Sequence, residues 1–420
     1  MSLMFRLACR SALSRWPTAL LTMLAIALSV TLFIGVEKIR VAAKASFADT
    51  ISGTDLIVGA RAGDVQLLLY SVFRIGNATA NITWRSYREI SAHPEVDWVI
   101  PISLGDSHRG FRVMGTNAAY FDHYRFRGGQ RLSFEAGKRF DDLFDAVIGT
   151  DVAEALGYRV GDPLVVAHGV GAFSFARHDD KPFRISGVLA RTGTPVDRTV
   201  HVSLEAIEAI HVDWKSGTRQ RERNVSAEDV RQMSLTPKSV TAALVGLKSR
   251  LSVFRLQRFI NEYRAEPLSA VLPGVALQQL WQLVGTAETA LGAVSLMVVA
   301  TALLGMMTVI LTALGERRRE MAILRSVGAR PSTILGLLVA EAGALTACGV
   351  VAGYALAHAA LFALRGYVDA RYGLFLDFGA PDLRELAVLA SIVVAGCAAG
   401  VLPGWRAYRM SLADGMTVRN

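Results

Sequence analysis

The residues that could perform catalysis are scattered through this 420-residue sequence. None of its eight histidines falls into an H-E-x-x-H motif or a comparable metal-binding spacing. No G-x-x-x-x-G-K-[ST] motif occurs, so the chain encodes no nucleotide-hydrolysing module of its own. The densest polar cluster, Arg-His-Asp-Asp at residues 177–180, is expected to be a solvated loop. We therefore expect no catalytic residue, no bound cofactor and no metal site, and we predict that this chain is not an enzyme.

The stretch at residues 314–333 is the most distinctive charged segment, with five arginines and two glutamates between two long apolar runs. Its strong helix formers predict a short helix whose apolar side chains are Met321, Ile323, Leu324 and Val327. Gly328 is a natural helix terminator, and the nearby Pro331 reinforces the stop. Such a helix suits insertion into a groove on a cytoplasmic partner, whereas a mere orientation signal would need only the arginines.

Polar and small residues also occur inside the apolar runs. Glu341 is expected about two turns into such a run, where an ionised carboxylate is costly unless it is paired or hydrated. It is either a contact that rearranges as helices move or a carboxylate that reaches water. Two pairs of glycines, each four residues apart, permit close helix packing: Gly349 with Gly353, and Gly396 with Gly400.

The elements that position these residues are predicted to be membrane helices. Hydrophobic residues make up 52% of the chain, charged residues only 19%, and the mean hydropathy is +0.35, which together indicate an integral membrane protein. Four apolar segments are long enough to span a bilayer. These segments are residues 19–36, 283–315 (a stalk followed by a span), 334–364 and 386–405. Residues 1–18 are expected to form an amphipathic cytoplasmic helix, although residues 1–45 also have features of a cleavable signal peptide.

Arginine placement predicts the orientation of these spans. Net charge is +3 before the first span, +3 in the connection at residues 316–333 and +2 in the tail at 406–420, but −1 in the loop at 365–385. Because basic residues stay in the cytoplasm, both termini and the 316–333 connection are expected there. The lipid bilayer is then a partner of the chain, and the net charge of +9 gives no reason to expect nucleic acid.

Residues 37–282 are predicted to form a large extracytoplasmic domain between the first two spans. Strands are expected at residues 55–58, 98–101, 111–114, 146–148, 163–166, 183–189, 200–202 and 242–247. Helices are expected at 84–92, 151–156, 204–210, 253–263 and, as part of the stalk, 268–282, whereas 215–231 is expected to be an exposed loop or a mobile helix. The fold class is thus four transmembrane α-helices plus a mixed α/β domain, with no sheet order predicted.

Several segments resemble those of the FtsX/MacB/LolC-type ABC transporter permeases. The most specific is residues 316–330, which read ERRREMAILRSVGAR. The lead at 5–32 and the tail at 403–416 resemble the two ends of these permeases, and Glu341 matches a carboxylate common early in their third span. Residues 147–163 and 183–188 look like the MacB-type periplasmic core domain. This resemblance covers essentially the whole chain.

The resemblance implies a type VII permease that works as a homodimer or heterodimer in the bacterial inner membrane. ATP and Mg²⁺ would be bound by a separate ATPase subunit, since no ATPase is fused to this chain. ATPase coupling would then involve part of the 316–333 connection. The residues in this role are Glu316, Arg317, Arg319, Glu320, Leu324, Arg325, Val327, Gly328 and Pro331.

The task of such a permease remains open at the level of sequence. Members of the family extract lipoproteins, export drugs or peptides with periplasmic or outer-membrane partners, or control cell-wall hydrolases. An alternative from another class is a membrane-anchored receptor or scaffold that works without ATP. That alternative predicts that scrambling residues 316–330 with their charge preserved has no effect.

Overall fold

The computed structural model describes residues 16–169, 178–215, 218–219, 225–372, 379 and 381–409. The chain divides into two compact units. We call Met1–Ala42, Gly285–Val368 and Leu376–Asn420 the helical unit, and Ala43–Val284 with Asp369–Phe375 the sheet unit. The predicted amphipathic helix at residues 1–18 lies almost entirely outside the described residues, as do residues 410–420 of the tail.

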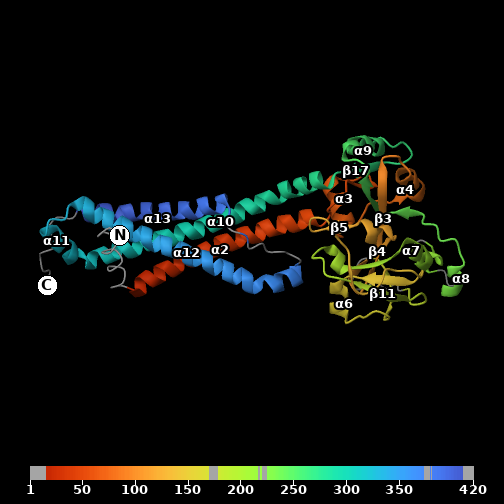
Figure 1. Ribbon diagram of the computed structural model, residues 1–420, viewed down its shortest axis with the longest axis horizontal. Coiled ribbons are helices and arrows are strands. Elements are labelled where there is room, and N and C mark those ends of the chain that lie inside the picture. Colours follow the sequence, from red (N-terminus) through yellow and green to blue (C-terminus); the bar gives the residue numbers. More distant parts are fainter. Residues whose placement is uncertain are drawn as a thin grey trace. The chain divides into compact units, whose positions relative to one another are not determined.

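Four long helices provide the helical unit: α2 (Trp16–Asp49), α10 (Pro273–Glu316), α12 (Pro331–Tyr372) and α13 (Leu383–Arg409). All four are long and apolar enough to cross a membrane, as the sequence predicts. Figure 1 shows them running alongside one another. With 44 residues, α10 is about 66 Å long, well beyond the ~30 Å hydrocarbon core of a bilayer. A shorter helix, α11 (Arg318–Ser326), connects α10 to α12.

Apolar side chains from all these helices form one buried cluster. Ile26 and Val30 of α2, Met306 of α10, Leu338 of α12 and Ile392 of α13 are among its members. Many other apolar side chains of the same helices are exposed, including Leu24, Leu296 and Val394. Exposed leucine and valine along such helices are expected where lipid replaces water.

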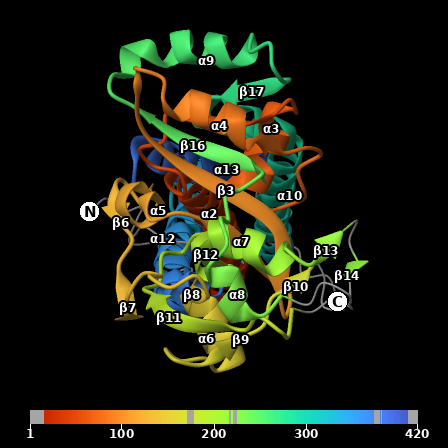
Figure 2. The same ribbon diagram turned by 90° about the vertical axis from the view of Figure 1, so that its right-hand side faces the viewer.

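The sheet unit is built on a mixed sheet of eleven strands with short helices around it (Figure 2). Its strands are β1 (Leu56–Ala60), β3 (Val96–His108), β4 (Phe111–Thr116), β7 (Phe134–Gly137), β8 (Asp145–Ile148), β9 (Pro163–Leu164), β10 (Ala167–His168), β11 (Phe183–Leu189), β12 (Thr199–Ser203), β16 (Ala242–Leu247) and β17 (Leu268–Val271). Two-stranded pairs are formed by β2 (Ile82–Thr83) with β15 (Ser239–Val240), β5 (Arg125–Phe126) with β6 (Gln130–Arg131), and β13 (Trp214–Lys215) with β14 (Thr218–Arg219). The α-helices are α3 (Asp64–Ser71), α4 (Trp84–Ser91), α5 (Ala119–His123), α6 (Thr150–Leu156), α7 (Leu204–His211), α8 (Ala227–Arg231) and α9 (Val253–Asn261), with 3₁₀ turns at Pro195–Arg198 and Arg250–Ser252.

The thirteen-residue strand β3 joins the two halves of this sheet. Its first half pairs with β16, and its second half pairs with β4 and β10. The order along the main path is β17-β1-β16-β3-β4-β12-β8-β11-β7. Most neighbours are antiparallel, but β12 with β4 and β11 with β8 are parallel. The register between β3 and β4 shifts between Leu104 and Ser107, which places a β-bulge at Gly105 and Asp106.

All eight strands and four of the five helices predicted from the sequence of this unit are present, with ends that differ by a few residues. The prediction of a helix at residues 268–282 is wrong for its first part, because Leu268–Val271 is strand β17, paired with β1. Within residues 215–231, the described part contains strand β14 and helix α8. The predicted loop at 365–385 is also partly helical, because α12 continues to Tyr372.

Candidate functional site

The candidate site is the connection between α10 and α12, where the sequence predicted a docking helix. Helix α10 ends at Glu316 and α11 begins at Arg318, so only Arg317 interrupts the helical path. The backbone of Arg317 nevertheless keeps both of its helical hydrogen bonds. Its N–H donates to the Ala313 carbonyl at 3.1 Å, and its carbonyl accepts from the Met321 N–H at 3.0 Å. The connection is therefore a bent extension of α10 rather than a loose loop.

Helix α11 has one face turned into the helical unit and one turned out. Met321 and Ala322 are buried, and Met321 belongs to the same apolar cluster as Ile334 and Leu338 of α12. On the other side, Ile323 is 55% exposed and Val327 is 84% exposed. Residues four apart share one face of a helix, so these two side chains form an outward apolar pair. Leu324 lies between the faces and is half-buried.

The end of α11 has the geometry of a Schellman motif. Gly328 has a φ of +98°, in the left-handed region that favours glycine. Its N–H donates to the Arg325 carbonyl at 3.1 Å, and the N–H of Ala329 donates to the Leu324 carbonyl at 2.9 Å. The predicted stop at Gly328 is thus confirmed. Pro331 follows as the first residue of α12, where its fixed φ favours helix initiation.

A buried ion pair ties the start of this connection to α12. The Arg317 guanidinium is 5% exposed and donates from Nη1 to Oε2 of Glu341 at 2.8 Å, and the Glu341 side chain is 13% exposed. Arg317 also lies 3.4 Å from Glu320 of α11. The carboxylate of Glu341 is therefore paired, which offsets the cost of an ionised group in an apolar run. The pair clamps α12 to the point at which α10 bends.

Both predicted glycine pairs lie at close contacts between helices of the same chain. A Cβ atom on Gly349 would come within 2.8 Å of Ile26, and one on Gly353 within 2.5 Å of the Ala27 carbonyl oxygen. Thr31 of α2 also donates a hydrogen bond to the Gly353 carbonyl at 3.0 Å. Because Gly349 and Gly353 have no side chains, the backbone of α2 can approach the backbone of α12 closely at these two positions.

The second pair does the same between α13 and α12. A Cβ atom on Gly396 would come within 2.1 Å of the Thr346 hydroxyl, and one on Gly400 within 2.7 Å of Ala342. Thr346 in turn donates to the Ala342 carbonyl of its own helix at 2.8 Å. Helix α12 is thus held on two sides by glycine contacts.

Comparison with protein families decides the class of protein. Residues 19–243 match the MacB-like periplasmic core domain, and residues 292–412 match the FtsX-like permease C-terminal domain. The first match alone spans more than half of the 420 residues. The chain belongs to the FtsX/MacB-type ABC transporter permeases.

Two solved structures are similar to part of this permease. One is the periplasmic region of MacB from Actinobacillus actinomycetemcomitans, which is 12% identical, with 55% of this chain and 94% of that chain covered and a TM-score of 0.33. The other is the extracellular domain of the noncanonic ABC-type transporter YknZ from Gram-positive bacteria, which is 13% identical, with 52% and 98% covered and a TM-score of 0.30. Comparison with curated proteins gave no match.

Family membership makes the chain a membrane subunit of an ABC transporter with an extracytoplasmic domain, and implies an ABC ATPase as its partner. Among the predicted coupling residues, Arg317 faces the interior, Leu324 and Arg325 are half-buried, and Glu320, Val327 and Gly328 face outward. The side chains of Glu316 and Arg319 lie outside the described residues. Met321, one of the predicted apolar residues of this helix, is unavailable to a partner because it is buried.

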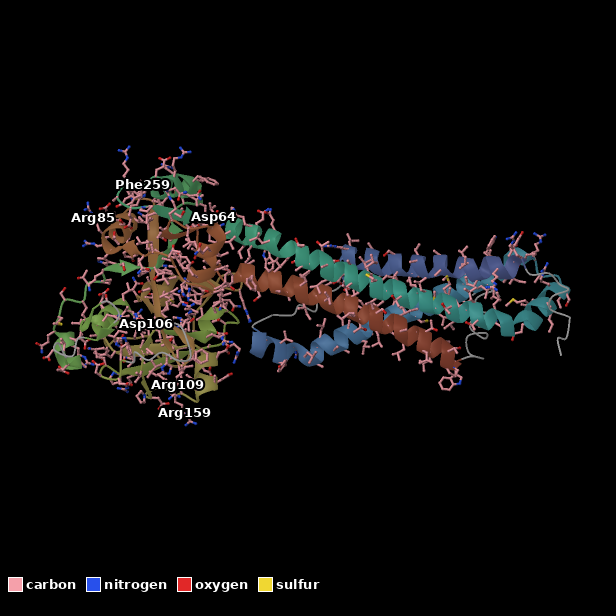
Figure 3. All side chains as sticks on the ribbon, turned by 180° about the vertical axis from the view of Figure 1, so that it is seen from behind. Asp64, Arg85, Asp106, Arg109, Arg159 and Phe259 are labelled. Atoms are coloured by element: carbon pink, nitrogen blue, oxygen red, sulfur yellow. The ribbon has the colours of Figure 1, made fainter. Side chains whose placement is uncertain are left out.

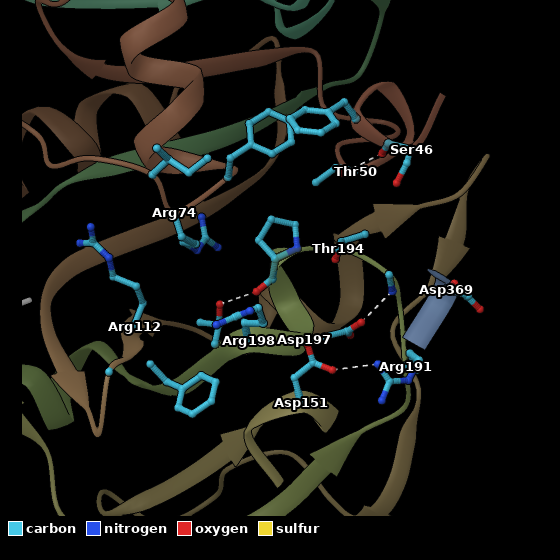
Figure 4. Close-up of a pocket in the computed structure, with 18 residues that line it drawn as sticks. Ser46, Thr50, Arg74, Arg112, Asp151, Arg191, Thr194, Asp197, Arg198 and Asp369 are labelled. Atoms are coloured by element: carbon cyan, nitrogen blue, oxygen red, sulfur yellow. Dashed lines mark hydrogen bonds and ion pairs between the residues drawn. The ribbon is translucent and has the colours of Figure 1, made fainter. Parts of the chain in front are cut away.

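The permease also has a cavity of about 420 Å³ in its sheet unit (Figure 4). Arg74, Arg112 and Arg198 line it, and Asp197 lies in its wall. Burial and, secondarily, the nearby charge of Arg74 lower the pKa of the Arg112 guanidinium below its usual value. Asp197 accepts hydrogen bonds from the Thr192 N–H at 2.8 Å and its hydroxyl at 2.7 Å, so it fixes the local loop rather than pairing with these arginines. Arg191, Asp151 and Asp369 line the cavity as well, so its wall carries charges of both signs.

One group of described residues could hold a metal ion, and the sequence did not predict it. Asp106, His168, His178 and His211 place their ligand atoms within 4.8 Å of one another. The expected solvated loop at residues 177–180 is wrong for His178, which is fully buried, and Arg177 lies outside the described residues. The four residues are spread over more than one hundred positions, so no local spacing could reveal them. Only the pairing of β3 with β10 and the position of α7 bring them together.

Proposed function

We propose that this chain is the permease subunit through which a separate ATPase performs mechanical work or export on the periplasmic side. The observation that carries this proposal is α11, an amphipathic helix with the apolar pair Ile323 and Val327 turned outward. Apolar side chains on a rigid, arginine-rich helix favour insertion into a groove on a protein partner. Orientation by arginine placement supports a cytoplasmic position for this helix and for both termini.

Rigidity on both sides of α11 supports a coupling role. The Schellman motif at Gly328 fixes its end, the Arg317–Glu341 pair fixes its start, and Met321 anchors its inner face. A displacement of α11 by ATP-driven closure of the partner would therefore move α10 and α12 together. Because α10 continues without a break to Pro273, beside strand β17, the motion has a direct covalent path to the sheet unit.

The proposal places two permease chains and two ATPase subunits in one complex of the bacterial inner membrane. Its substrate is handled by the extracytoplasmic domain and is a lipoprotein, a peptide or a drug-type molecule. ATP and Mg²⁺ are assigned to the ATPase alone.

The test is the double variant Ile323→Asp/Val327→Asp in the complete complex, compared with Leu251→Asp. Leu251 is 92% exposed in the sheet unit, so the control introduces aspartate at an exposed apolar position away from α11. Truncating central apolar anchors commonly costs about 2–4 kcal/mol, so ATPase affinity should fall ~30-fold or more. The control should keep wild-type affinity. Equal affinity in all three proteins would overturn the docking role of α11, whereas a wild type that binds no ATPase would favour an anchored receptor that works without ATP.

A further inference from the structure

Three histidines and one aspartate meet on one side of β3, away from the α10–α12 connection. Asp106 lies in the β-bulge of β3, and His168 is its direct partner in the neighbouring strand β10. His178 lies on the segment that leads to β11, and His211 is the last residue of α7. Asp106 is buried, and in the view of Figure 3 it lies between Arg85 and Arg159 on the sheet unit. Four separate elements therefore deliver one side chain each.

The distances among these groups fit a common tetrahedral centre. His168 Nδ1 lies 3.1 Å from Asp106 Oδ1 and 3.1 Å from His211 Nε2, and His211 Nε2 lies 3.6 Å from Asp106 Oδ1. Zinc binds imidazole nitrogen and carboxylate oxygen at about 2.0–2.1 Å, so the ligand atoms of a tetrahedral site lie about 3.3 Å apart. The three distances fall on both sides of that value. The His178 ring lies 5.1 Å from the His211 ring, centroid to centroid, and its ligand atom completes the group.

A backbone hydrogen bond orients His211 for such a role. Its Nδ1 lies 2.7 Å from the Ile207 carbonyl oxygen, one turn earlier in α7. Because a carbonyl oxygen only accepts, Nδ1 carries the hydrogen and the lone pair of the neutral ring is on Nε2, which faces the cluster. Metal-binding histidines are held in this way by outer-shell carbonyl or carboxylate partners. The β-bulge likewise redirects the Asp106 side chain toward the histidines.

We propose that Asp106, His168, His178 and His211 form a four-coordinate site for a divalent transition metal ion, zinc in the first instance. Imidazole ligands with one carboxylate suit Zn²⁺, Cu²⁺ and Ni²⁺, whereas Ca²⁺ and Mg²⁺ prefer all-oxygen sites. All four tetrahedral positions are filled by protein, so the site is of the closed, structural kind. The ion cross-links β3, β10, α7 and the segment before β11. This assignment is independent of the role of α11.

Zinc binding by the full-length chain tests the proposal. The purified permease, carrying an affinity tag without histidine, is treated with a chelator, dialysed and incubated with Zn²⁺ alone. Bound zinc is then measured after desalting, together with the thermal unfolding midpoint. We expect one zinc ion per chain and a higher midpoint, because a ligand that binds only the folded state stabilises it. The control His93→Ala removes a half-buried histidine outside the cluster and should behave like the wild type.

Variants of the cluster separate metal binding from simple packing. His168→Ala removes the side chain of the most exposed ligand. Asp106→Asn removes the charge of a buried ligand but keeps the size of its side chain. Each should lower zinc affinity by at least about a hundredfold, more than the ~10–100-fold typical of losing an outer-shell partner. Both should also abolish the zinc-induced rise in the unfolding midpoint, while retaining the midpoint of the chelated wild type within a few degrees.

Cobalt provides a readout of geometry. Co²⁺ bound to the wild type should give the intense visible absorption of a four-coordinate site, and His168→Ala should lose it. Zinc stoichiometry that is unchanged in both variants, a wild type that retains no zinc, or a weak six-coordinate cobalt spectrum would each overturn the proposal. The four residues would then be a hydrogen-bonded network of histidines around Asp106.

Discussion

The helical unit and the sheet unit are stabilised by different forces. In the sheet unit, Ile57, Leu67, Ile100 and Tyr120 are among many apolar side chains removed from water, and the hydrophobic effect stabilises their burial. In the helical unit, exposed leucine and valine face surroundings as apolar as themselves, so burial alone gives little reason for helices to associate. There, association depends on close glycine contacts and on a small number of polar pairs. A substitution at one small or charged residue should therefore change stability more in the helical unit than in the sheet unit.

The same difference explains what the sequence could predict. The four long apolar helices, the stop at Gly328 and the glycine pairs all follow from neighbours within a few residues, and the structure contains them. The sequence shows that an ionised Glu341 is costly in an apolar run, but not which residue pairs with it. Its partner Arg317 lies 24 residues away, outside α12, and pairing across that distance depends on how the helices pack.

In the sheet unit, short-range patterns predicted individual strands but not their order. β1 pairs with β16 and β17, which lie about 200 residues further along the chain. The Asp106 cluster depends on such long-range pairing, since β10 was not predicted and the segment of His178 was expected to be solvated. The sequence predicts a helix where the structure has β17, because the four residues Leu268–Val271 are too few to show an alternation that distinguishes strand from helix.

Removing one partner of the buried pair should produce the largest effect. Glu341→Gln removes the carboxylate that accepts from the buried Arg317 guanidinium at 2.8 Å, and loss of one partner of a buried pair typically costs about 3–5 kcal/mol. We expect a loss near ~3 kcal/mol in the free energy of unfolding, measured in detergent. The double variant Arg317→Met/Glu341→Met should recover most of this stability. A Glu341→Gln protein as stable as the wild type would mean that the pair does not hold α11 to α12.

Filling a glycine contact should have the next largest effect. Gly353→Leu places a side chain where the Ala27 backbone lies, so α2 must move away from α12, with a cost of about 1–3 kcal/mol. Gly366→Leu is the matched control on the same helix, because nothing lies within 4 Å of a Cβ atom there. Thermal unfolding should separate the two variants by several degrees. Equal midpoints would show that lipid tolerates the displaced helix.

Acid should weaken the sheet unit through a buried histidine. Burial lowers the pKa of His201 to about 3, from an ordinary value near 6.5. Between these values the unfolded chain binds a proton that the folded chain does not, so stability rises with pH across this window. His201 should contribute a loss of about 1.4 kcal/mol per pH unit from pH 6 down to pH 4. Unfolding midpoints of the wild type and His201→Gln, measured across this range, should converge on acidification; parallel curves would contradict the assignment.

The smallest effect is expected at a solvent-exposed pair. Lys138 and Asp141 form an ion pair in which both side chains are mostly exposed. Water and salt screen such pairs, so Asp141→Asn should leave the unfolding midpoint unchanged within error. A clearly lower midpoint would contradict this expectation and would show that exposed ion pairs contribute measurably to the stability of the sheet unit.

The central claim is that α11 transmits the state of an ATPase to the sheet unit, and a distance measurement tests it directly. Spin labels at Ser326→Cys on α11 and Arg85→Cys on α4 would be placed in a chain whose Cys9, Cys348 and Cys397 are replaced by serine. In the complex with its ATPase, ATP should shift the distance distribution between the two labels. The shift should disappear in Ile323→Asp/Val327→Asp. A distribution that is identical with and without ATP in the intact complex would contradict the account.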